Sequence, residues 1–100
     1  MLTGKQKRYL RSLAQTIKPV MQVGKQGVTD AFIQSVHEQL DAHELIKISV
    51  LQNVVEDKRV IAEGIAERTN SELVQIIGNQ LVFYRENKTK ERKDKIILPE

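Results

Sequence analysis

Apolar side chains recur every three or four residues in three stretches of this chain, and each stretch predicts an amphipathic helix. The predicted helices cover residues 3–17, 29–42 and about 53–70. Their apolar faces consist of Leu2, Tyr9, Leu10, Leu13 and Ile17 in the first, Phe32, Ile33, Val36 and Leu40 in the second, and Ile61, Ala62 and Ile65 with Val54 or Val55 in the third.

Residues with capping chemistry set the expected helix ends. Thr3 is the expected N-cap of the first helix. Asn53 with Glu56 three residues later resembles a capping box, so we expect the third helix to begin near Asn53. Asn70 is expected to close that helix in the left-handed conformation.

Four short apolar stretches predict strands at residues 20–23, 45–51, 73–77 and 81–84. The Gly-Asn pair at 78–79 indicates a two-residue hairpin between the last two strands. The order α-β-α-β-α-β-β predicts an α/β fold. Two right-handed βαβ crossovers followed by a hairpin would give a mixed four-stranded sheet packed with three helices.

The length of 100 residues is that of one domain. We assign residues 1–86 to this single domain and residues 87–100 to a basic C-terminal tail, because the chain becomes strongly charged after Arg85. The segment 96–99 is apolar enough to dock back on the domain.

Charge is unevenly distributed although the net charge is only +3. Residues 1–27 contain six basic side chains and no acidic one, whereas residues 28–84 contain nine acidic and four basic side chains. This pattern favours a basic surface that faces a polyanion, carried on an acidic body. A solvated helix face with a basic tail would give a similar pattern.

The segment Gly24-Lys25-Gln26-Gly27 lies between the first predicted strand and the second predicted helix. Glycines let a ligand backbone approach closely, and the start of a helix favours phosphate. The loop is therefore a candidate clamp for a nucleic-acid backbone, with Lys25 as a mobile charge. A plain tight turn is the alternative, and Asp30 places a negative charge near the proposed site.

Several classes of function are disfavoured. Without cysteine there is no disulfide or thiolate metal site, and His37 and His43 have no third ligand at suitable spacing, so we expect no metal and no cofactor. The carboxylates are scattered over helix surfaces, which argues against an enzyme. No apolar run approaches the roughly 20 residues of a membrane span, and no signal-peptide pattern follows Met1, so we expect a cytoplasmic protein.

Only four aromatic residues are present, and Phe83 and Tyr84 should face opposite sides of one strand. One of them should lie in the core, and the other could stack on a base. With so few aromatics, recognition of a nucleic acid should depend mainly on its backbone phosphates and its shape.

Four motifs together resemble the CRM domain, the RNA-binding domain named for chloroplast RNA splicing and ribosome maturation, and in particular its stand-alone bacterial form, the YhbY-like family. They are Lys18-Pro19, residues 23–28, residues 43–47 and residues 77–85. The resemblance covers nearly the whole chain. It implies a fold similar to the C-terminal domain of translation initiation factor three.

The resemblance also implies RNA binding through the loop and a neighbouring basic surface, and association with ribosomal RNA in precursors of the large ribosomal subunit. It assigns the loop role to Gly24, Lys25, Gln26 and Gly27 and the basic surface to Lys5, Lys7, Arg8, Arg11 and Lys18, with Lys88, Lys90, Arg92 and Lys93 as further tail candidates.

Two alternatives stay open. The chain could bind another RNA, or its acidic face and third helix could dock a ribosomal protein or assembly factor. No membrane and no small-molecule substrate are expected.

Overall fold

The computed structural model describes residues 2–89 and 95–100. Its elements, in chain order, are α1 (Gly4–Ala14), β1 (Met21–Val23), α2 (Asp30–His43), β2 (Leu45–Val50), α3 (Lys58–Thr69), β3 (Glu72–Ile77) and β4 (Gln80–Tyr84). The predicted α/β order is confirmed, with three helices and a mixed four-stranded sheet.

The strands lie side by side in the order β1-β2-β4-β3. β1 pairs with β2 in parallel, and β4 runs antiparallel to both β2 and β3. The β1-α2-β2 crossover therefore joins neighbours, whereas the connection through α3 skips one position, which β4 fills. The hairpin turn at 78–79 is confirmed, and Gly78 takes a φ of +55° there.

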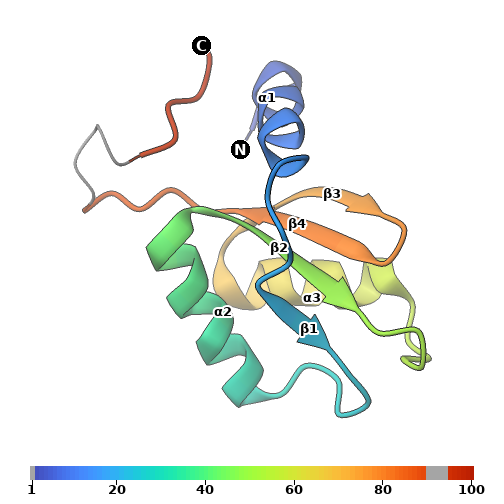
Figure 1. Ribbon diagram of the computed structural model, residues 1–100. Helices are drawn as coiled ribbons and strands as arrows, with labels where there is room; N and C mark the ends of the chain where they lie inside the picture. Colours follow the sequence, from blue (N-terminus) through green and yellow to red (C-terminus); the bar gives the residue numbers. More distant parts are fainter. Residues whose placement is uncertain (1, 90–94) are drawn as a thin grey trace.

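Successive side chains of each strand point to opposite faces of the sheet. On β2, Ile46 and Ile48 belong to the cluster beneath α2 and α3, whereas Leu45 belongs to the cluster beneath α1. Figure 1 shows α1 on one side of the sheet and α2 and α3 on the other. The first helix buries Leu10 and Ala14, while Tyr9, which we expected on the apolar face, is exposed.

Two of the expected caps are confirmed and one is wrong. Thr3 forms a capping box with Gln6, and Asn70 closes α3 with a φ of +54°. The third helix begins at Lys58 rather than near Asn53, because the side chain of Asp57 accepts the N–H of Arg59 at 2.7 Å. The preceding residues instead form a turn, in which Val54 N–H donates to the Leu51 carbonyl.

The C-terminal segment lies on the α1 side of the sheet. Ile96 and Leu98 pack against the cluster formed by α1 and the sheet. The side-chain amide of Gln6 donates to the carbonyl of Pro99 at 3.1 Å. The apolar end of the chain thus docks on the body as expected. No helix in the described part of the chain is long and apolar enough to span a membrane.

Candidate nucleic-acid interface

The loop that follows β1 is closed by one hydrogen bond, from Gly27 N–H to the Gly24 carbonyl at 2.9 Å. Lys25 and Gln26 occupy the tip of this turn and are exposed. Gly27 has a φ of +71°, a left-handed conformation that glycine adopts at lower cost than residues with a Cβ. Gly24 has no positive φ, and an added Cβ would meet only Leu51 Cδ1, at 3.6 Å. The conformation of the turn therefore accounts for a glycine at position 27 but not for one at position 24.

The start of α2 adjoins this turn. Thr29 caps the helix by accepting the N–H of Phe32 at 3.1 Å. The N–H groups of Asp30 and Ala31 have no intrahelical acceptor at this position and give the helix start its partial positive charge. The Asp30 carboxylate, which argued against an anion site, lies 2.6 Å from the Arg68 guanidinium of α3. Arg68 thereby offsets its charge.

The basic side chains of α1 form a second region. Lys5 and Arg8 are exposed, and Lys7 and Arg11 are partly buried. Figure 1 shows α1 on one side of the sheet and the loop after β1 far from it, at the opposite end of the view. The structure thus places the predicted residues in two separate regions. They are joined by the exposed linker between α1 and β1, which carries Lys18.

Of the four basic tail residues, Lys88 is exposed. Lys90, Arg92 and Lys93 lie outside the described residues. Lys95 forms an ion pair with Glu86, and this pair lowers the pKa of the Glu86 carboxyl.

Sequence reasoning missed a buried carboxylate at the end of α2. Glu44 is fully buried, and its two oxygens accept the N–H groups of Asn87 at 2.7 Å and Ile96 at 2.9 Å. Its φ of +64° is unusual for a residue with a side chain. Glu44 lies in one of the motifs of the resemblance, residues 43–47, but the motif does not indicate this role, which depends on two segments far along the chain. Glu44 holds both ends of the segment between Asn87 and Ile96.

Arg85 joins three elements at the end of β4. Its guanidinium contacts His37 Nδ1 at 2.8 Å, donates to the Thr69 carbonyl at 2.7 Å, and pairs with Asp41 at 2.9 Å. Arg85 ends one of the motifs of the resemblance, and its contacts give it a structural role. The described residues contain no cluster of metal-ligating side chains.

Both aromatic residues of β4 are buried. Phe83 packs beneath α2 and α3, and Tyr84 beneath α1. Burial, with the nearby charges of Glu44 and Glu86, raises the pKa of Tyr84 to about 12. The expectation that one of them could stack on a base is therefore wrong, because neither ring is accessible.

Comparisons with known proteins agree with this architecture. The model of the CRS1 / YhbY (CRM) domain matches residues 2–85. The "Probable RNA-binding protein YqeI" of Bacillus subtilis is 56% identical over 88 residues, which cover 88% of this chain and 92% of that protein. An "RNA-binding protein" of Haemophilus influenzae is 38% identical over 84 residues, covering 84% and 85%.

A solved structure shows the same fold. The solution structure of a Staphylococcus aureus protein, described as a candidate RNA-binding protein, superposes with a TM-score of 0.80 at 54% sequence identity. The match covers 99% of this chain and 100% of that one.

Proposed function

The chain belongs to the CRS1 / YhbY (CRM) domain family, and on that premise we propose that it binds ribosomal RNA in precursors of the large ribosomal subunit, without catalysis. Relatives in two bacteria are named RNA-binding proteins. The acid-free segment 1–27 supplies the electrostatic attraction that RNA binding needs.

The observation that carries this proposal is the geometry of Gly24. This glycine has neither a positive φ nor a crowded Cβ position, so the fold itself does not require it. A missing side chain beside an exposed lysine and a helix start lets an RNA backbone approach the main chain. In this proposal Lys25 and the first N–H groups of α2 contact phosphate oxygens, while Gln26 adds a polar contact at the tip.

The basic residues of α1 are a second set of phosphate contacts in this proposal. Because α1 and the loop lie apart, the RNA spans the linker between them, where Lys18 is exposed. Lys88 and the other basic tail residues extend the same attraction. The acidic body disfavours RNA elsewhere and so sets the orientation.

The test is a titration of ribosomal RNA fragments at several salt concentrations with wild type and Lys25→Glu. One phosphate contact corresponds to a slope of about 0.7–0.9 in log K against log salt. We expect Lys25→Glu to weaken binding severalfold and to flatten the slope by about one contact. Lys58→Glu, at the start of α3, makes the same charge change outside the proposed surface and should change binding less. A folded Lys25→Glu protein with wild-type affinity and slope would refute the clamp.

One feature favours a second function, docking of a ribosomal protein or assembly factor. Val55, which precedes α3, is fully exposed, and Val60, which lies on α3, is also exposed. A charge reversal at Arg11 and Lys25 should abolish RNA binding but leave a protein partner on α3 bound. Val60→Asp should instead abolish binding of the protein partner and leave RNA binding unchanged.

A further inference from the structure

A groove of about 490 Å³ lies between the linker that joins α1 to β1 and the junction of α2 with β2. Its size falls within the range of roughly 300–1,000 Å³ typical of pockets for small organic ligands. Its apolar walls are formed by Leu13, Ile17, Val20, Leu45, Ile46 and Ile96. Ile96 is held at this wall by its apolar contacts and by the hydrogen bond from its N–H to Glu44.

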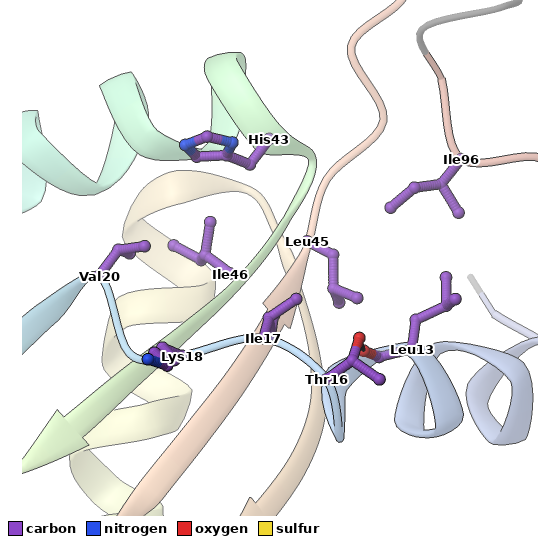
Figure 2. A pocket seen from close by; sticks show the side chains of 9 residues that line it. All are labelled: Leu13, Thr16, Ile17, Lys18, Val20, His43, Leu45, Ile46 and Ile96. Atoms are coloured by element: carbon purple, nitrogen blue, oxygen red, sulfur yellow. Dashed lines mark hydrogen bonds between the residues drawn. The ribbon is translucent and has the colours of Figure 1, made fainter.

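The polar residues of the groove carry no negative charge. They are Thr16, Lys18 and His43. Figure 2 shows His43 and Lys18 on opposite sides of the groove, with Ile46 between them and Ile17 and Leu45 to one side. Within residues 2–89 and 95–100, neither the Lys18 ammonium nor the His43 ring has a hydrogen-bond partner. Both groups are therefore free to contact a ligand.

The position of the groove connects the two basic regions. Its linker wall runs from the end of α1 to the start of β1, the strand that ends at the Gly24 turn. An RNA that contacts both α1 and the turn passes over this linker. We infer that the groove receives one unstacked base of the bound RNA, an inference that rests on the proposed function.

The chemistry of a nucleotide fits these walls. The faces of a base are flat and weakly polar, and they pack well against apolar and aromatic side chains. The edge of the base carries donors and acceptors that the His43 ring can meet. The attached phosphate is anionic, and Lys18 at the rim supplies the opposite charge. An apolar peptide would fill the same walls but would bring no negative charge to Lys18.

This site changes the expected mode of recognition. The phosphate contacts of the loop and α1 carry no sequence information, whereas a base held in a pocket can be distinguished by its edge. The groove would thus supply selectivity for an unpaired nucleotide in an otherwise backbone-directed interface. It also explains how recognition proceeds although Phe83 and Tyr84 are buried.

The experiment uses the full chain and ribosomal RNA fragments that contain the photoreactive base 4-thiouridine. Val20 is 42% exposed at the groove wall, so Val20→Trp fills the groove from its edge. We expect this variant to lose crosslinks at the linker and at His43 and to bind at least about fivefold more weakly. The salt slope should stay unchanged, because the phosphate contacts are intact.

Two further variants make the result interpretable. Val60→Trp places the same bulk on an exposed position of α3 and should bind like wild type. His43→Ala removes an exposed side chain without filling the groove, and it should lower affinity and reduce selectivity among bases. This second variant tests the inference even if Val20→Trp does not fold.

Three outcomes oppose the inference. Wild-type affinity in folded Val20→Trp and His43→Ala, with crosslinks outside the groove, would overturn it while the Lys25→Glu result still supports the proposed function. Loss of a ribosomal-protein partner with unchanged RNA binding would show that the groove holds a peptide. If wild type itself binds no RNA fragment, the proposed function is refuted, and the inference about the groove is refuted with it.

Discussion

Among the described residues, twelve buried side chains form one hydrophobic cluster on the α2/α3 face of the sheet, whereas the cluster on the α1 face has six. The larger cluster is assembled from β1, β2, β4 and two helices. The smaller one is completed by partly buried residues near both chain ends, among them Leu2, Ile96 and Leu98. Because stabilisation scales with apolar area removed from water, the α2/α3 face contributes more to the fold.

The residues that contribute most to stability therefore lie apart from those of the proposed RNA interface on α1. The basic residues of α1 lie on the thinner face, and the groove lies at its border, where the linker and the C-terminal segment meet the end of α2 and the start of β2. Regions with fewer buried contacts open at lower free-energy cost. An interface on this side can therefore adjust to RNA without disturbing the main core.

The largest expected effects on stability come from substitutions that create a cavity on each face of the sheet. Phe83→Ala should lower the free energy of unfolding by about 3–5 kcal/mol, because the ring is fully buried beneath α2 and α3. Leu10→Ala, equally buried beneath α1, should cost about 2 kcal/mol, since the chain-end segments can close on the cavity. Urea denaturation gives both values. Equal losses would contradict the unequal roles of the two faces.

The next largest effect concerns the carboxylate that holds the C-terminal segment. Glu44→Gln replaces one acceptor oxygen by a donor that faces a backbone N–H, and should cost about 1.5–3 kcal/mol. Hydrogen exchange at the Ile96 amide should accelerate more than at amides of α3. Glu38→Gln, an exposed change on the same helix, is the control. Unchanged exchange at Ile96 would show that the segment is held by its apolar contacts alone.

Stability and RNA binding should also separate within the glycine loop. Gly27→Ala forces a left-handed conformation on a residue with a Cβ and should cost about 1–2 kcal/mol. Gly24→Ala should change stability little but weaken binding of ribosomal RNA fragments, since the added methyl group keeps the RNA backbone away. Thermal unfolding and RNA titration of both variants check this. RNA binding by Gly24→Ala at wild-type strength would remove the main support for the clamp.

The smallest expected effect is alkaline destabilisation of the α1 face. The folded state raises the pKa of Tyr84 from 10.0 to about 12, so the unfolded chain releases this proton first. Stability from this residue should be complete below pH 10 and should fall as pH rises through about 12. Tyr84→Phe should show a shallower decline in melting temperature over this interval. An identical decline would assign the effect to other groups.

Local features of this protein were predictable from neighbouring residues. The caps at Thr3 and Asn70, the hairpin at 78–79 and the element order all depend on side chains a few positions apart. The exposed turn with Lys25 at its tip was predicted from the spacing of Gly24 and Gly27, although only Gly27 needs the conformational freedom of glycine there. The predicted start of α3 was wrong because Asn53 and Asp57 are both possible N-caps, and the sequence pattern does not show which of them is used.

The tertiary structure alone decided the features that depend on distant segments. β4 lies between β2 and β3, so that its backbone groups pair along both edges, and no local pattern specifies that order. The burial of Glu44 depends on amides at Asn87 and Ile96. The groove depends on a linker, a helix end and the C-terminal segment meeting in space. Sequence determines local conformation through near neighbours, whereas these sites arise only when the sheet brings remote segments together.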